Sequence, residues 1–286
     1  MKHIFLAVWV AVLGLVSALA EPTRFTVRVE GTGPDVVLIP GLACSPWVWE
    51  QTVAQWQATH RCHLIFVQGF AGTPVGGNAS GPVVPPLVEE LAAYLAAQKL
   101  AKPAVIGHSL GGFTALLLAA RHPEKVGRVL VVDALPFLPL MFHPGATAQS
   151  VRSIAERTRD QMLALSPEQF ALAQQTALAA MVKSPAVQAK VQPEVATSDQ
   201  GVMARAMFDL LTEDARPLLA KITAPLTVLY AYEASRGMAA ATVDTLYQAA
   251  YAKAPRAKLQ RVENSMHFIM ADQPEAFAAA VAEFLQ

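Results

Sequence analysis

Residues 103–120 read PAVIGHSLGGFTALLLAA, and this stretch decides the fold because it holds a strand, a sharp turn and a helix in succession. Residues 104–106 form a short apolar run rich in β-branched side chains, which is typical of a buried strand. Residues 113–120 are good helix formers, and the run stops before Pro123. The turn between them is therefore fixed on both sides by regular structure.

The turn itself, residues 107–111, reads GHSLG and matches the pattern G-x-S-x-G. A serine at the tip of such a turn adopts a strained backbone, and glycines on either side keep Cβ atoms from colliding with the strand and the helix. We therefore expect Ser109 to be a nucleophile at the N-terminus of the helix. The Leu110 N–H would point to where an oxyanion forms, and His108 is expected to be a packing neighbour.

Strand-like and helical segments alternate over most of the chain, which predicts an α/β fold with a doubly wound, mostly parallel sheet. Between residues 136 and 195 the alternation stops, and helices are expected over 151–165, 167–183 and 184–191. Such an all-helical insertion at the strand ends predicts a cap. The expected organisation is a core over 21–135, a helical cap over 136–197 and a second part of the core over 198–286.

The first twenty residues have the composition of a signal peptide. Lys2 and His3 provide a short basic start, residues 4–16 are apolar throughout, and residues 18–20 are Ala-Leu-Ala. A membrane-spanning helix needs roughly 20 apolar residues, so we expect cleavage near Ala20 rather than a stable membrane anchor. The protein is then exported, to the periplasm or as a secreted protein.

The composition of the chain limits which partners it can bind, and the positions of its two cysteines limit whether a disulfide can form. The 286 residues include 22 basic and 22 acidic side chains, and 53% are hydrophobic, which indicates a large core and no nucleic-acid partner.

Cys44 is expected after the carboxyl end of one strand and Cys62 at the amino end of the next. These ends of a parallel sheet are on the order of 15 Å apart, so both thiols are expected to be free.

A serine nucleophile requires a base, and His267 follows the last expected strand, where such a base belongs. The chain order serine, acid, histidine favours a carboxylate after the strand at 226–230, where Glu233 is available. Asp133, at the end of the strand at 128–132, is the alternative acid. The two carboxylates remain alternatives at this point.

Residues 36–39 are expected to form a buried strand, which is followed by the loop Pro40-Gly41-Leu42. We expect a second oxyanion donor in this loop. The glycine permits close approach of the backbone, and the Leu42 N–H would be the donor. Apolar side chains on nearby loops predict a hydrophobic substrate pocket: Trp47, Phe137, Met141 and Phe268. The alternative is that these side chains fill the interface between cap and core.

These motifs together resemble the α/β-hydrolase fold superfamily, in the branch with a serine nucleophile and a helical cap after the sixth strand. The resemblance covers residues 24–286 and rests on residues 40–42, 107–112 and 266–268. An aspartate at the elbow would imply dehalogenase or epoxide chemistry, whereas Ser109 implies acyl transfer.

The resulting hypothesis is a serine hydrolase that cleaves hydrophobic carboxylic esters or lactones through an acyl-enzyme, with no cofactor and no metal. A prolyl-type aminopeptidase on the same fold is an alternative, and it would need acidic cap residues such as Glu156, Asp160 and Glu168 to hold an amine. A non-catalytic protein that binds a ligand in the same pocket is the other alternative. The oligomeric state is not predicted.

Overall fold

The computed structural model describes residues 21–286, and the expected signal peptide and its cleavage site lie outside these residues. The described chain contains a seven-stranded sheet with the order β1-β3-β2-β4-β5-β6-β7, in which β1 is antiparallel to β3 and the other neighbours are parallel. The strands are β1 (Phe25–Gly31), β2 (Asp35–Ile39), β3 (Arg61–Val67), β4 (Ala104–His108), β5 (Arg128–Val132), β6 (Leu226–Tyr232) and β7 (Lys258–Glu263). The predicted mostly parallel sheet is therefore confirmed.

The central strands β2, β4 and β5 are apolar along most of their length because helices cover both faces of the sheet. Their register pairs Ile39 with Gly107 and His108 with Val132. The carboxyl ends of the three strands consequently lie side by side, and the loops that follow them meet at one edge of the sheet.

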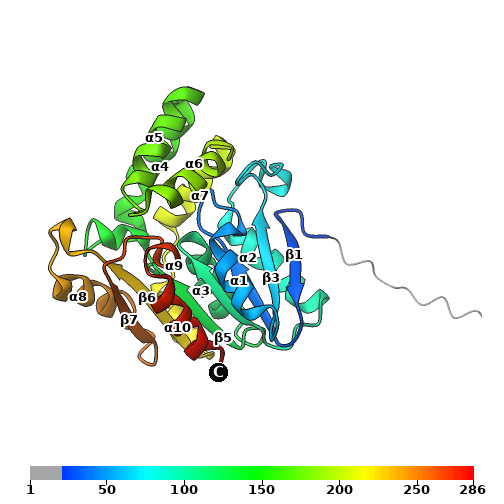
Figure 1. The fold of residues 1–286 in the computed structure, drawn as a ribbon. Coiled ribbons are helices and arrows are strands. Elements are labelled where there is room, and N and C mark those ends of the chain that lie inside the picture. The colour runs from blue at the N-terminus through cyan, green and yellow to red at the C-terminus, as the bar shows by residue number, and fades with distance from the viewer. Residues whose placement is uncertain (1–20) are drawn as a thin grey trace, which may run out of the picture.

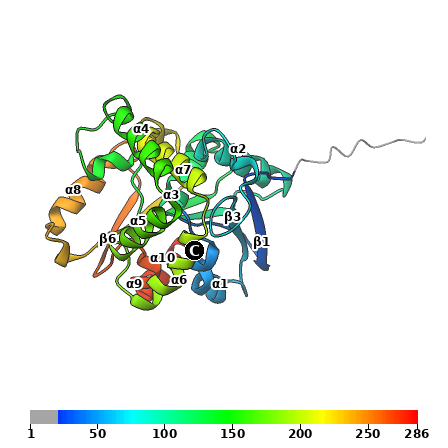
Figure 2. The ribbon, with the colours of Figure 1, turned by 90° about the horizontal axis from the view of Figure 1, so that it is seen from above.

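Helices pack on both faces of the sheet, as Figure 2 shows: α2 and α3 lie on one side, and α1 and α10 lie on the other. Trp49 stacks on Phe277, with 6.2 Å between the ring centroids, and so joins the start of α1 to α10. The core helices are α1 (Glu50–Trp56), α2 (Val84–Ala97), α3 (Leu110–Arg121), α8 (Ala240–Ala250), α9 (Ile269–Asp272) and α10 (Pro274–Leu285). Short 3-10 helices are η1 (Pro46–Trp49), η2 (Gly76–Asn78), η3 (Leu138–Met141), η4 (Arg216–Lys221) and η5 (Ala234–Arg236).

A helical segment separates β5 from β6 and rises above the carboxyl edge of the sheet (Figure 1). Its helices are α4 (Ala148–Ala164), α5 (Pro167–Ala179), α6 (Pro185–Ala196) and α7 (Gln200–Thr212). Each begins with a side chain that accepts a hydrogen bond from the backbone of the first turn: Thr147, Ser166, Ser184 and Asp199. In the numbering of this chain the insertion follows the fifth strand, one earlier than the expected sixth. The helix α7 begins after residue 197, the expected end of the cap, yet it packs along α4, which belongs to the cap. The position of that boundary therefore stays a prediction.

Both cysteines are free and buried, which confirms the expected absence of a disulfide between them. Cys44 follows β2, and Cys62 lies near the start of β3. Burial raises the pKa of both thiols, that of Cys62 to about 11. Over residues 21–286, none of the helices combines the length and the apolar character that a membrane crossing requires.

Asn78 fastens the first strand to the body of the molecule from a completely buried position in η2. Its amide Nδ2 donates to the carbonyl oxygens of Arg24 (3.1 Å) and Gln68 (2.9 Å), and its Oδ1 accepts from the Arg24 guanidinium at 2.9 Å. One side chain thus holds the start of β1 and the end of β3 together.

Candidate active site

Ser109 occupies the turn between β4 and α3 with φ 54° and ψ −120°, which is a strained conformation for a residue with a side chain. A Cβ added at Gly107 would lie 2.2 Å from the Gly111 carbonyl oxygen, and one added at Gly111 would lie 2.2 Å from that of Ile39. The Ser109 N–H donates to the carbonyl of Val132 at 2.9 Å. The flanking glycines are therefore required, and the strained serine is held at the N-terminus of α3 as the motif predicts.

His267 lies in the loop between β7 and α9, and its Nδ1 is 2.6 Å from Oδ2 of Asp133. Asp133 directly follows β5 and has a left-handed backbone with φ 48°. Its Oδ1 accepts hydrogen bonds from the Ala231 N–H at 2.9 Å and from the Tyr247 hydroxyl at 3.1 Å. Three donors from three different segments thus converge on this carboxylate.

The carboxylate of Asp133 keeps its charge despite its burial. Burial raises the pKa of Asp133, but the hydrogen bond and the charge of His267, together with the Ala231 N–H, lower it more, so that the net shift is downward. Because Nδ1 donates to this carboxylate, the other ring nitrogen of His267, Nε2, is left to exchange a proton.

Glu233, the carboxylate favoured from the sequence as the partner of His267, is not the one that the structure places there. Its carboxylate binds the Lys183 ammonium and accepts from the Ser235 N–H at 3.3 Å. Lys183 also donates to the Asn264 carbonyl at 3.2 Å, so the ion pair joins the cap to two core loops. The hydrogen bond from Lys183 is the largest cause of the lowered pKa of Glu233. The alternative carboxylate, Asp133, holds the imidazole instead.

His108 has a role that the sequence pattern did not reveal. Its Nε2 donates to the backbone carbonyl of His267 at 3.0 Å, and the two rings are 4.6 Å apart. Burial, with a smaller contribution from the neighbouring His267, lowers the pKa of His108 to about 3, so its ring is neutral. Since a carbonyl only accepts, the proton of His108 lies on Nε2. This bond ties the serine turn directly to the histidine loop.

The loop after β2, residues 40–45, lies against the nucleophile and is called the oxyanion loop below. A Cβ added at Gly41 would lie 2.9 Å from Nδ1 of His108 and 3.3 Å from the Ser109 Cβ, so a larger residue would force the loop or the His108 ring to move. The Cys44 N–H donates to the Gly41 carbonyl at 3.2 Å and closes a turn at Leu42 and Ala43. Within residues 21–286 the backbone N–H groups of Leu42 and Leu110 donate to no protein acceptor. An oxyanion hole requires such free donors beside the nucleophile.

Of the four expected pocket residues, Phe268 contacts the imidazole and Trp47 contacts Phe268. Trp47 stacks on Phe268, with ring centroids 6.4 Å apart, and Phe268 contacts His267 edge-on at 5.7 Å. Phe137 is instead fully buried beneath the Arg216 guanidinium, and Met141 is 48% exposed. Phe268 is itself only 3% exposed, so the assignment of these side chains to a substrate pocket stays a prediction.

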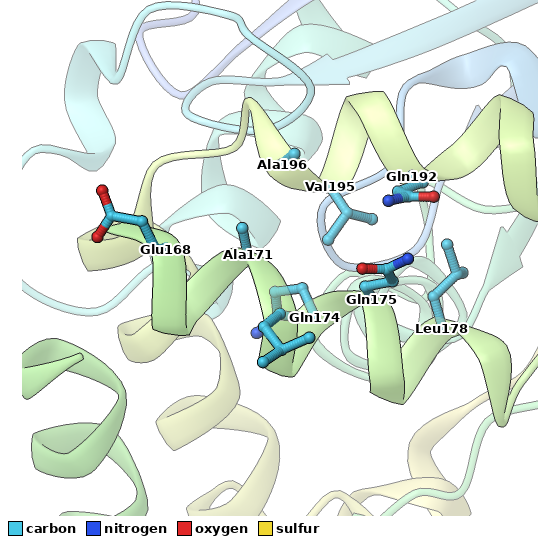
Figure 3. A pocket seen from close by; sticks show the side chains of 9 residues that line it. Glu168, Ala171, Gln174, Gln175, Leu178, Gln192, Val195 and Ala196 are labelled. Carbon is cyan, nitrogen blue, oxygen red and sulfur yellow. The ribbon is translucent and has the colours of Figure 1, made fainter. Parts of the chain in front are cut away.

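A separate cavity of about 230 Å³ lies in the cap between α5 and α6. Figure 3 shows carboxamide and aliphatic side chains turned into this space. Its lining consists of Glu168, Ala171, Leu172, Gln174, Gln175, Leu178, Gln192, Val195 and Ala196. None of the residues of the serine–histidine site belongs to this lining. Over the part of the chain that the structure describes, no group of three or more His, Cys, Asp or Glu side chains is arranged to hold a metal ion.

Comparisons with known proteins match most of the chain. Residues 36–280 match the family described as alpha/beta hydrolase. A pimeloyl-[acyl-carrier protein] methyl ester esterase of Aeromonas hydrophila is 36% identical over 113 residues, which are 39% of this chain and 42% of that relative. The corresponding esterase of Edwardsiella ictaluri is 29% identical over 259 residues, which are 87% of this chain and 92% of that relative.

The chain thus aligns with less than half the length of the Aeromonas relative but with nearly all of the Edwardsiella one. Among solved structures, a hydrolase from Pseudomonas aeruginosa superposes with a TM-score of 0.74 at 19% identity, over 91% of this chain and 94% of that one. This structural likeness concerns the fold alone.

Proposed function

The chain belongs to the alpha/beta hydrolase family, and from this premise we propose that it hydrolyses carboxylic esters or lactones through an acyl-enzyme on Ser109. The observation that carries the proposal is the 2.6 Å contact between His267 and Asp133. The hydrogen bond from His108 to the His267 carbonyl connects this histidine–carboxylate pair to the strained Ser109 turn. A serine, a base and an orienting carboxylate are the parts that acyl transfer requires.

In the first half of the reaction, the Ser109 hydroxyl gives its proton to Nε2 of His267 while Oγ attacks the ester carbonyl. The Leu42 and Leu110 N–H groups donate to the oxyanion that forms. Asp133 stabilises the imidazolium, which then protonates the leaving alcohol as the carbon–oxygen bond breaks. The acyl group remains on Oγ of Ser109.

In the second half, a water molecule gives a proton to His267 and attacks the acyl-enzyme. The same two N–H groups donate to the second oxyanion. Collapse of this intermediate releases the carboxylic acid, and the proton on His267 returns to Oγ of Ser109. With a lactone, the alcohol and the acid are released as one hydroxy acid.

The relatives support an ester substrate, because the Aeromonas and Edwardsiella proteins are both esterases of methyl esters. The aromatic stack of Trp47 on Phe268 supports a hydrophobic acyl group beside the imidazole. We therefore propose small alkyl esters or lactones with apolar acyl groups as the substrate class.

The carboxylates that an aminopeptidase would need in the cap have other partners. Glu156 pairs with Arg152 and Asp160 pairs with Arg159, each on α4. Glu168 accepts a hydrogen bond from Ser166. They therefore do not form a common site for a substrate amine, and the ester hydrolase is the function that we propose.

The test combines mass spectrometry after reaction with a fluorophosphonate probe and an assay with short-chain p-nitrophenyl esters. We expect one adduct, on Ser109, and turnover that is lost in Ser109→Ala. A folded protein that forms no adduct and does not turn over any ester would contradict the proposal and favour a binding protein. Adduct formation on another residue would contradict the assignment of the nucleophile.

We also propose that the protein is exported and acts in the periplasm or outside the cell. The support is the basic start and the apolar run of residues 4–16. N-terminal sequencing of the protein recovered from its native compartment is expected to begin at Glu21. A cytoplasmic protein that retains Met1 would contradict this.

A further inference from the structure

The oxyanion loop has a strained backbone. Ala43 adopts φ 62° although it carries a side chain, and it is almost fully buried at 1% exposure. A left-handed alanine is costly, and it persists only where surrounding contacts hold it. Leu42, whose N–H is the proposed oxyanion donor, is the residue immediately before it. Whatever holds Ala43 and Ser45 therefore sets the direction of this donor.

These contacts come from the C-terminal end of α6 and from Ser198, which lies between α6 and α7. Glu194 accepts from the Ser45 N–H through Oε2 at 2.9 Å, and its Oε1 accepts from the Ser45 hydroxyl. Ser198 places its hydroxyl 3.3 Å from the Ala43 carbonyl and accepts from the Ala71 N–H at 2.8 Å. Two consecutive turns of the cap thus contact the oxyanion loop.

The side chain that holds the oxyanion loop carries a carboxylate rather than a neutral group. Glu194 is partly buried, and both of its oxygens accept hydrogen bonds from Ser45. The nearby cation Lys190 is paired with Glu50 instead. Removal of a carboxylate from water is costly, and hydrogen bonds from a backbone N–H to a charged acceptor are shorter and stronger than those between neutral groups. The charge of Glu194 therefore serves to hold the oxyanion loop in position.

We infer that Glu194 is a positioning residue that holds the oxyanion loop, so that the Leu42 N–H faces the oxyanion on Ser109. This inference rests on the proposed function, and it assigns to a cap residue the completion of a site in the core. The loop contributes to the transition state more than to the bound substrate, because the oxyanion exists only there.

The test compares Glu194→Ala and Glu194→Gln with wild type. A displaced oxyanion donor costs between about tenfold and a hundredfold in kcat, with KM nearly unchanged. Glutamine retains one acceptor oxygen, so we expect Glu194→Gln to recover most of the loss. The affinity for phenylboronic acid, which adds to serine as a tetrahedral boronate, should fall in parallel with kcat/KM.

Glu50→Gln is the matched control. It breaks the exposed ion pair between Lys190 on α6 and Glu50 on α1, and it leaves the contacts to Ser45 in place. We expect this variant to keep wild-type kcat and boronate affinity. If Glu50→Gln and Glu194→Ala lost activity equally, general attachment of the cap would explain the effect and the inference would be wrong.

Hydrogen exchange measured by mass spectrometry separates this inference from the proposed function. The peptide that contains residues 40–46 should exchange faster in Glu194→Ala than in wild type or Glu50→Gln, whether or not esters are turned over. An inactive wild type would overturn the proposed function alone. An active wild type whose kcat, boronate affinity and exchange are all unchanged by Glu194→Ala would overturn the inference. If Glu194→Ala does not fold, Ser45→Ala, which removes the hydroxyl that donates to Glu194, provides the same comparison.

Discussion

Asp133 combines a left-handed backbone, a buried carboxylate and a retained negative charge in one residue. The Ala231 N–H and the Tyr247 hydroxyl both donate to Oδ1, which leaves Oδ2 for the imidazole. This division fixes the orientation of the carboxylate and therefore the tautomer of His267. Glu233, two residues beyond Ala231, has its charge neutralised by Lys183.

Substitution of Asp133 and Glu233, one at a time, shows which of the two carboxylates acts with His267. Asp133→Asn is expected to lower kcat by about 10³- to 10⁴-fold, because an amide neither fixes the tautomer of His267 nor stabilises the imidazolium. Glu233→Gln should change kcat less than about tenfold, since it breaks an ion pair that is partly open to solvent. Ester hydrolysis by the purified variants decides the matter. The reverse order of effects would restore Glu233 as the acid.

Tyr247 provides a finer test of the same carboxylate. Tyr247→Phe removes the hydroxyl that donates to Oδ1, so the Asp133 charge is less stabilised and holds the imidazolium more strongly. We expect the acidic limb of the kcat/KM–pH profile to move to higher pH, with a loss in kcat of about fivefold.

Tyr251→Phe is the control for this substitution, because its hydroxyl donates to the Ala134 carbonyl at 2.6 Å rather than to Asp133. It should leave the pH profile unchanged. Equal shifts in the two variants would indicate an effect of core packing rather than of the hydrogen bond to Asp133.

Single residues also mark where sequence reasoning succeeds and where it fails. Ser109 could be placed because the glycine spacing and the flanking strand and helix are local properties. The acid could not be chosen, because the choice depends on Lys183, which is 50 residues before Glu233, and on Tyr247, which is 114 residues after Asp133. The hydrogen bond of His108 to the His267 carbonyl spans 159 residues, and no local pattern signals it.

At the scale of elements, α2 depends on a carboxylate from another helix. Asp209 on α7 is 5% exposed and accepts from the N–H groups of Val83 and Val84 at 2.7 and 2.8 Å. These donors belong to the start of α2, which has no side-chain cap of its own. Burial raises the pKa of Asp209 from 3.8 to about 6, although the hydrogen bonds from Val84 and Val83 oppose this.

The raised pKa of Asp209 predicts a pH-dependent stability. Below pH 4 both the folded and the unfolded chain hold the proton, and stability is lost as the pH rises to about 6, where the folded chain also ionises. The gap between the two pKa values corresponds to about 3 kcal/mol. Relative to wild type, Asp209→Asn should therefore gain up to this amount in the free energy of unfolding between pH 4 and pH 7.

Urea unfolding at a series of pH values measures this difference. Parallel stability profiles for wild type and Asp209→Asn would contradict the prediction. Asp209→Ala, which leaves the Val83 and Val84 N–H groups without an acceptor, should be less stable than Asp209→Asn at every pH, by about 1–3 kcal/mol.

The elements themselves could be predicted well because their signals are local. The buried strands β2 and β5 are short apolar runs, and α5 and α6 begin at Ser-Pro steps, where a serine caps and a proline fits the first turn. The helical segment after β2 is divided into η1 and α1, because the Ser45 side chain caps a tighter turn that begins at Pro46. How the cap attaches to the core could not be predicted, because the attachment joins residues far apart in sequence.

At the scale of the whole molecule, the segment around α6 is the bridge between cap and core. Lys183 binds Glu233 near β6, Lys190 binds Glu50 on α1, and Glu194 binds Ser45 in the oxyanion loop. In Figure 1 this part of the cap lies over the carboxyl edge of the sheet. The cap is therefore fastened to the core by polar contacts on several loops.

The core, in contrast, holds together without a covalent cross-link between its two cysteines. Both thiols are buried with raised pKa values, so the native protein should not react with a thiol reagent, whereas the unfolded chain should show two thiols. The thermal unfolding midpoint should be the same with and without reductant. A native protein that loses stability in dithiothreitol, or an unfolded chain without titratable thiols, would contradict this.

The burial of Asn78 also restricts how the protein can be produced. Residues 78–80, Asn-Ala-Ser, form an acceptor sequence for N-linked glycosylation, and the nitrogen that would carry the glycan is the one that donates to Arg24 and Gln68. A eukaryotic secretory host that modified the nascent chain would prevent β1 from docking. Ser80→Ala, at an exposed position, removes the acceptor sequence and leaves the Asn78 anchor intact.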